Sequence, residues 1–271
     1  MKRIILAILI VCLLAVFLFS AWKVLDIWLE YREGEKTYEE LDQYISVPET
    51  TAPAETIPLD PTETVEQETA PEEITIPAEE TIDWPEVDFA ALKEINPDVV
   101  GWIYIPGTNV NYPVVQGEDN DQYMHRLITG KYNGAGSIFL DAAVAPGFSA
   151  QNNTIYGHNM KSGTMFHETI GYKKQDFYDT HPTAMLLTPE VNYIVRFFSG
   201  YVTDAWGDAW EYTFTEAEFQ TWLEERTQQS WFASDVIPST QSQILTLSTC
   251  SYEVYEGRFV LHGVLEAYPV S

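Results

Sequence analysis

Two stretches near the C-terminus, Gln243-Ile-Leu-Thr-Leu-Ser-Thr-Cys250 and Arg258-Phe-Val-Leu-His-Gly-Val-Leu265, decide the fold. Both are rich in aliphatic and β-branched residues, which favours strands. If the strands on either side of Ser251–Gly257 pair as a hairpin, Arg258 returns to the neighbourhood of Cys250. The first stretch becomes polar as it ends, so we expect Cys250 at a sheet edge beside a loop.

Cys250 is a candidate nucleophile because no second cysteine lies in the polar part of the chain; the other, Cys12, is in an apolar N-terminal run. An unpaired thiol in an exported protein is a candidate reactive group, although a lone cysteine is equally expected as a small buried residue. Thiolate chemistry is helped by nearby positive charge. Arg258 would provide that charge for a thiolate or an oxyanion, and an ordinary surface arginine is the alternative.

A thiol nucleophile also needs a proton donor and acceptor, and the chain has five histidines. His158 lies in Asn153-Thr-Ile-Tyr-Gly-His-Asn-Met160, just after a predicted strand, where Gly157 permits a sharp turn. His262 lies within a predicted strand, where we expect it to be packed or on the surface. His158 is therefore the leading candidate, and no pattern marks His125, His167 and His181.

The N-terminal region predicts a membrane anchor. Ile4 to about Trp22 is apolar and as a helix would span about 28 Å, close to the thickness of a bilayer core. Lys2 and Arg3 favour a cytoplasmic N-terminus, so we expect a single-pass protein of the cell membrane with its folded domain outside. A cleaved signal peptide is the alternative, but the run is long and lacks a small-x-small ending.

The remaining chain divides by composition. We expect the anchor at residues 1–23, a juxtamembrane helix at 24–46, a disordered Pro/Thr/Glu-rich linker at 47–83 and the folded domain at 84–271. The linker is expected to hold the folded domain away from the membrane. With 41 acidic and 14 basic residues, the net charge of −27 argues against nucleic acid as a partner.

The folded part is predicted to be mainly β. Phe89–Ile95, Gly163–Phe177 and Thr215–Gln228 read as helices, the last with a capping box at Thr215 and Glu218. Many short strands with a few peripheral helices favour a closed or partly closed β-barrel. The predicted strands are Val99–Ile105, Tyr112–Val115, Ser137–Leu140, Asn153–Tyr156, Ala184–Leu187, Asn192–Val202, Gln243–Thr249 and Arg258–Glu266.

Taken together, Tyr-Gly-His158-Asn-Met, Thr246-Leu-Ser-Thr-Cys250 and Arg258 resemble the sortases, cysteine transpeptidases of Gram-positive cell surfaces. The resemblance is to class B and covers about residues 88–267. It extends to the following segments: Gln116–Met124, Gly136–Asp141, Gly163–Phe166, Phe177–Pro182 and Cys250-Ser-Tyr-Glu253.

The resemblance implies an eight-stranded barrel in which Cys250 is the nucleophile, His158 the general acid or base and Arg258 the oxyanion stabiliser. It also implies that the Ser251 backbone N–H adds an oxyanion donor. We expect no cofactor, and no metal site is visible in the sequence. The partners would be secreted proteins with a C-terminal sorting signal and an amine acceptor, either a peptidoglycan precursor or a pilin lysine. The residues expected to contact the sorting peptide or line its approach are Asn120, Met124, Ser248 and Thr249.

Two other functions remain open at this point. A membrane-anchored cysteine peptidase would use the same thiol and imidazole but transfer the acyl group to water. A surface scaffold that keeps the barrel without activity is the second alternative. The sequence is compatible with several sorting motifs and with either amine acceptor.

Overall fold

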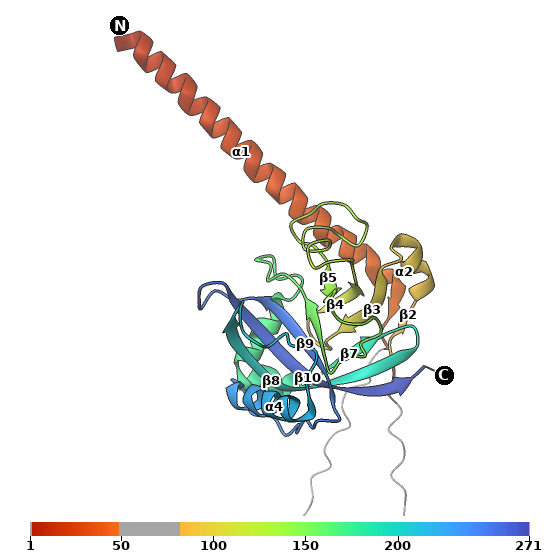
Figure 1. Cartoon of the computed structure of the whole chain (residues 1–271). Coiled ribbons are helices and arrows are strands. Elements are labelled where there is room, and N and C mark those ends of the chain that lie inside the picture. The colour runs from red at the N-terminus through yellow and green to blue at the C-terminus, as the bar shows by residue number, and fades with distance from the viewer. Residues whose placement is uncertain (1, 49–81, 271) are drawn as a thin grey trace, which may run out of the picture.

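In a computed structural model, which describes residues 2–48 and 82–270, eight strands close into a mixed β-barrel. Their order around the barrel is β10-β8-β7-β3-β4-β5-β6-β9, with the parallel pairs β4–β5 and β6–β9 and antiparallel pairs elsewhere (Figure 1). The predicted barrel is confirmed, and each predicted strand has its counterpart. The strands are β3 Val99–Tyr104, β4 Asn111–Val115, β5 Ile138–Leu140, β6 Asn152–Tyr156, β7 Thr183–Leu187, β8 Val191–Asp204, β9 Gln243–Cys250 and β10 Gly257–Pro269.

The barrel closes around an apolar core because strand residues alternate between its two faces. Leu245 and Leu247 of β9 face this core, together with fully buried Trp102 of β3 and Phe259 of β10. The opposite face of β9 carries Thr246 and Ser248. By the same alternation Cys250 lies on that face, outside the apolar core.

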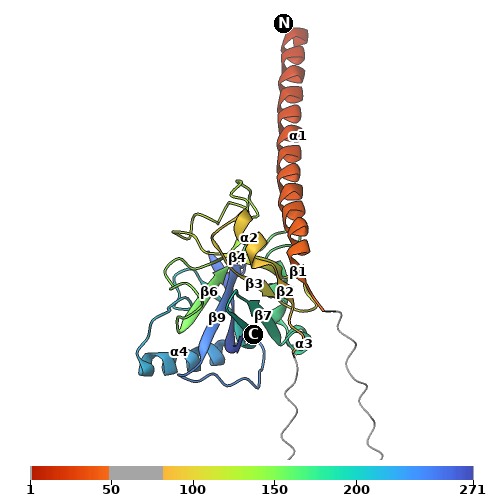
Figure 2. The same ribbon diagram turned by 90° about the vertical axis from the view of Figure 1, so that its right-hand side faces the viewer.

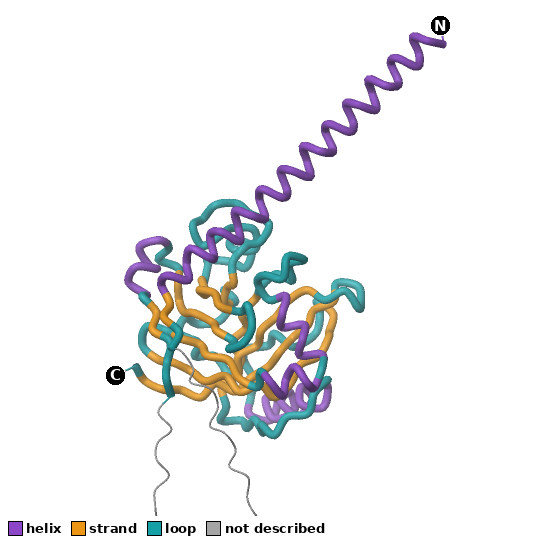
Figure 3. The backbone as a smooth tube through the Cα atoms, turned by 180° about the vertical axis from the view of Figure 1, so that it is seen from behind, coloured by secondary structure: helices purple, strands orange, loops and turns teal. Residues whose placement is uncertain are grey.

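Short helices lie around the barrel (Figure 3). They are α2 Phe89–Ile95, the 3₁₀ helix η2 His167–Lys173, α3 Gln175–Thr180 and α4 Glu216–Gln229. α4 begins at the predicted capping box, in which Thr215 and Glu218 each accept from the other's backbone N–H. Its apolar side packs against Phe198 of β8 and Ile244 of β9 through Phe219, Trp222 and Leu223.

The continuous helix predicted over Gly163–Phe177 is wrong. The chain enters the region through left-handed conformations at Gly163 and Met165, which end any helix there. η2 then stops at Lys173, and extended Lys174 separates it from α3. The bend brings the Phe177 ring so close to Gly171 that a Cβ there would lie 2.7 Å from it.

The N-terminal region forms one uninterrupted helix, α1 Lys2–Leu41, which extends away from the barrel (Figure 2). It is long and apolar enough to cross a membrane. Its last turns contact the barrel, where Tyr38 and Leu41 are buried in the main core cluster. A 3₁₀ turn, η1 Asp42–Tyr44, and the short strand β1 Ile45–Ser46 follow.

β1 pairs antiparallel with β2 Glu86–Val87. This pair brings together the two ends of the segment predicted as a linker, of which residues 49–81 lie outside the described part of the chain. The expectation that this segment holds the domain away from the membrane stays a prediction. α1 itself contacts the barrel through Tyr38 and Leu41.

Candidate active site

Cys250 and Arg258 are direct partners in the β9–β10 ladder. Residues opposite each other in an antiparallel pair project their side chains from the same face of the sheet. The predicted hairpin thus brings the thiol and the guanidinium to one face. Arg258 is partly buried, and its Nη1 donates to the carbonyls of Glu256 and Gly257 at 3.0 and 3.1 Å.

His158 reaches the same place along a parallel strand. β6 pairs with β9 in a register that matches Tyr156 to Ser248, so two residues further on His158 is level with Cys250. The Gly157 N–H continues the pairing by donating to the Ser248 carbonyl at 3.1 Å. A side chain at Gly157 would meet Ile138 at 2.5 Å, so close packing requires glycine there.

One pocket of about 400 Å³ collects these side chains. It holds seven of the eight site residues predicted from sequence: Asn120, Met124, His158, Ser248, Thr249, Cys250 and Arg258. The pocket is also lined by Phe139, Tyr156, Gly157, Ala205 and Trp210.

The eighth residue, Ser251, is placed differently. Its backbone N–H donates to the Gly257 carbonyl at 2.8 Å, which closes the β9–β10 turn. An N–H engaged in this way is not free to donate to an oxyanion. The predicted role of Ser251 therefore needs this hydrogen bond to open, whereas the Arg258 guanidinium already lies in the pocket.

The hydrogen bonding of His158 identifies its tautomer. Nε2 lies 2.7 Å from the Met124 carbonyl, and a carbonyl only accepts, so Nε2 carries a proton. Nδ1 is then the ring nitrogen left to exchange a proton with the thiol or the substrate. Burial lowers the pKa of His158 below its usual range, an effect opposed by the Met124 carbonyl and increased by His125.

The structure gives His125 and Asn159 roles that the sequence did not. The His125 and His158 rings are stacked, with centroids 5.6 Å apart and planes 15° from parallel. Asn159 Nδ2 donates to the Cys250 carbonyl at 2.9 Å, and Asn159 Oδ1 lies 2.7 Å from His167 Nδ1. Asn159 stands in the motif around His158, but only the folded chain brings it to Cys250.

Lys173 is a further neighbour that the sequence did not mark. Its Nζ donates to Ser251 Oγ at 3.0 Å and forms an ion pair with Glu253, which also accepts from Ser251 Oγ. The hydrogen bonds from Lys173 and Ser251 lower the pKa of Glu253 to about 2. This cluster joins the turn after Cys250 to η2.

Several residues that line the pocket also make polar contacts. Buried Asp141 accepts from Tyr156 OH at 2.8 Å and from Asn120 Nδ2 at 3.2 Å. Trp210 Nε1 donates to Ser248 Oγ at 3.1 Å. Thr249 Oγ1 is buried and has no hydrogen-bond partner among the described residues.

His262 has a structural environment away from this pocket. It is fully buried, with Nδ1 2.7 Å from Thr246 Oγ1 and Nε2 3.2 Å from Tyr201 OH. Of the two positions predicted for His262, packed or on the surface, the structure shows the packed one. Among residues 2–48 and 82–270, no group of three or more His, Cys, Asp or Glu side chains is arranged to hold a metal ion.

A thiol, an imidazole and a guanidinium come together around one strand, which pairs in parallel on one side and antiparallel on the other. On a mixed barrel this arrangement defines a cysteine acyl-transfer site. No protein-family model matches the chain. Sortase B of Listeria monocytogenes is 40% identical over 177 residues, which is 64% of this chain and 72% of the relative. Sortase B of Staphylococcus aureus is 34% identical over 163 residues, 60% of this chain and 67% of the relative.

Solved structures agree with these relatives. Sortase B from Bacillus anthracis in complex with AAEK1 matches with a TM-score of 0.68 and 30% identity, over 88% of this chain and 99% of that one. Staphylococcus aureus sortase B matches with a TM-score of 0.63 and 33% identity, over 68% and 87%. The chain belongs to the sortase B family and is a cysteine transpeptidase.

Proposed function

We propose that this transpeptidase cleaves a sorting motif near the C-terminus of secreted proteins after a threonine and transfers the acyl group to an amine. The observation that carries the proposal is the single pocket that contains Cys250, His158 and Arg258. A Staphylococcus aureus sortase B has been solved as a substrate complex, and a sortase B has been solved in complex with triglycine. Both support a peptide substrate and a glycine-like amine for this chain.

In the first step the Cys250 thiolate attacks the threonine carbonyl and Arg258 stabilises the oxyanion. Protonated His158 gives its Nδ1 proton to the leaving amine as the C–N bond breaks, and a thioester remains on Cys250. In the second step neutral His158 takes a proton from the incoming amine as the new amide forms and the Cys250 thiolate leaves, which restores the thiolate and imidazolium of the first step. Covalent catalysis thus divides one amide exchange into two easier steps.

The reacting state requires a thiolate and an imidazolium together. Because burial lowers the pKa of His158, the imidazolium is a minor form at neutral pH. We therefore expect a pH–rate profile with a maximum. A flat profile between about pH 5 and 10 would contradict a role for both groups.

The acceptor amine comes from a peptidoglycan precursor or, in a pilus-type enzyme, from a pilin lysine. The proposed location is the cell membrane, spanned once by the apolar part of α1, with the barrel outside. An enzyme and a substrate anchored in one membrane meet at a raised effective concentration. This arrangement suits secreted proteins that pause in the membrane on their own C-terminal segments.

The test uses the full chain in detergent micelles, as the native protein and as Cys250→Ala. Each is incubated with x-Pro-x-Thr-x peptides, with and without amines such as triglycine, and products are followed by mass spectrometry. A thioester on Cys250 cut after threonine and resolved by the amine supports the proposal and identifies the motif. Cleavage by water alone, unchanged by the amine, would favour the peptidase, and absence of any adduct would favour the inactive scaffold.

A further inference from the structure

The anchor helix contacts the segments that hold His158. We infer that Tyr38 of α1 is a positioning residue for His158. It contacts Gly136, which packs against the carbonyl that binds the His158 ring, and Tyr112, which bonds to the segment that binds the His158 backbone. The inference rests on the proposed role of His158 in proton transfer. It goes further by making the end of the membrane helix part of the active-site support.

The first connection runs through the loop between β4 and β5. Tyr38 OH donates to the Gly136 carbonyl at 2.6 Å and lies 3.1 Å from Ser137 Oγ. Gly136 has a left-handed φ of +60° and packs so tightly that a Cβ there would lie 2.4 Å from the Met124 carbonyl oxygen. That oxygen accepts the Nε2–H of His158. A shift of Gly136 therefore moves the acceptor that orients the His158 ring.

The second connection runs through Tyr112 of β4. The Tyr38 and Tyr112 rings meet edge to face at 5.4 Å. Tyr112 OH accepts from the Met165 N–H at 3.0 Å, and the next N–H, that of Phe166, donates to the His158 carbonyl at 3.0 Å. Tyr38 is thus connected to the His158 ring through Gly136 and to the His158 backbone through Tyr112.

The surroundings show that this contact is built into the structure. Tyr38 is 8% exposed, so its hydrogen bond to Gly136 is sheltered from competing water. Two turns earlier in α1, the Glu30 carboxylate accepts from the Gly134 N–H at 2.6 Å. The Glu30 backbone carbonyl accepts from Asn133 Nδ2 at 2.8 Å. α1 therefore holds the β4–β5 loop at three places, the third being the ion pair between Glu33 and Lys131.

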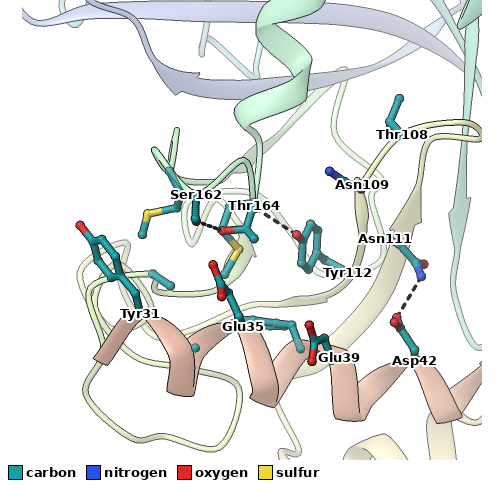
Figure 4. A pocket seen from close by; sticks show the side chains of 15 residues that line it. Tyr31, Glu35, Glu39, Asp42, Thr108, Asn109, Asn111, Tyr112, Ser162 and Thr164 are labelled. Atoms are coloured by element: carbon teal, nitrogen blue, oxygen red, sulfur yellow. Dashed lines mark hydrogen bonds between the residues drawn. The ribbon is translucent and has the colours of Figure 1, made fainter. Parts of the chain in front are cut away.

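A cavity of about 370 Å³ lies beside this contact. Figure 4 shows it between α1 and the segment that follows His158, with Tyr112 pointing across toward that segment. Tyr31 lines the same cavity, and its hydroxyl makes no hydrogen bond within the described residues. Tyr31 is therefore a matched control on the same helix.

The test compares Tyr38→Phe with Tyr31→Phe in the full chain in micelles. Each loses one hydroxyl, and only the first loses the bond to Gly136. The pKa of His158 is followed by NMR on protein labelled at histidine Cε1, with the signal assigned by His158→Gln. The rate constant kcat and KM for a sorting peptide are measured in parallel. The titratable and charged groups near the His158 ring, His125, Cys250 and Arg258, are unchanged in both variants.

In Tyr38→Phe we expect His158 to titrate at lower pH, because a looser Met124 carbonyl stabilises the imidazolium less. We expect kcat to fall about threefold to tenfold with KM within about twofold, the effect of one neutral hydrogen bond. Tyr31→Phe should match the native protein in both readouts. An unchanged His158 titration and kcat in Tyr38→Phe, with only a lower Tm, would overturn the inference and leave Tyr38 a purely structural residue.

The two readouts also separate this inference from the proposed function. If His158→Gln remains fully active, the proposed role of His158 fails. The NMR titration still decides whether Tyr38 holds the ring, because it reads the imidazole and not the reaction.

Discussion

Asn159 donates a hydrogen bond to the Cys250 backbone carbonyl at 2.9 Å and so ties the turn that carries His158 to the strand that carries the thiol. Cys250 ends β9, whereas His158 lies two residues after the end of β6. Their separation therefore depends on contacts such as this one. The relationship leads to the first prediction.

Asn159→Ala should lower kcat about tenfold or more while KM changes little, because the thiol and imidazole lose a shared support. Steady-state kinetics with a sorting peptide measures both constants. Ser162→Ala, in the exposed part of the same loop, is the control and should keep native kinetics. Equal kinetics in Asn159→Ala and the control would show that this bond does not position the pair.

His125→Gln should raise the pKa of His158. His125 is stacked on His158 and its charge opposes a second charge there, so removing it favours the His158 imidazolium. The part of the pH–rate profile that is set by the protonation of His158 should then move to higher pH. A shift to lower pH, or none, in both the profile and the histidine NMR titration would exclude this electrostatic coupling.

Arg258→Ala should reduce kcat/KM by about 10²- to 10³-fold, the loss typical of an oxyanion donor, and Arg258→Lys should recover only part of it. Lysine restores the charge but not the planar set of donors. Both variants should still be alkylated at Cys250 by iodoacetamide, which checks that the thiol remains accessible. Native activity in Arg258→Ala would leave the guanidinium outside the mechanism.

Buried His262 should make the fold sensitive to acid. Burial, aided by Arg226, lowers its pKa to about 3 in the folded protein. Below the usual histidine pKa of about 6.5 the unfolded chain gains a proton that the folded chain does not, so stability is lost as pH falls from about 6.5 toward 3.

The free energy of unfolding in urea should therefore fall by about 2–3 kcal/mol from this group between about pH 7 and 4.5. His262→Gln should remove that part of the slope, since glutamine can still hydrogen bond with Thr246 and Tyr201 but does not titrate. Comparable m-values in the two proteins would show that the same unfolding is being measured. Identical pH slopes would contradict the buried neutral histidine.

The sequence by itself determined which residues form strands and which are the candidates for the chemistry. The aliphatic runs ending at Cys250 and beginning at Arg258 are periodic over several residues, and local propensity is sufficient to identify them. The same holds for α4, whose capping box at Thr215 is a local signal. The motif around His158 was recognisable for the same reason, since its residues are contiguous in the chain.

The tertiary structure alone decided what lies next to what. The stacking of His125 on His158, the bond from Asn159 to Cys250 and the support from Tyr38 join residues that are distant in the chain or separated by turns. The break between η2 and α3 likewise follows from left-handed residues and close packing, which override helical propensity. Such contacts depend on how the barrel closes and on where α1 packs, and no local pattern encodes that geometry.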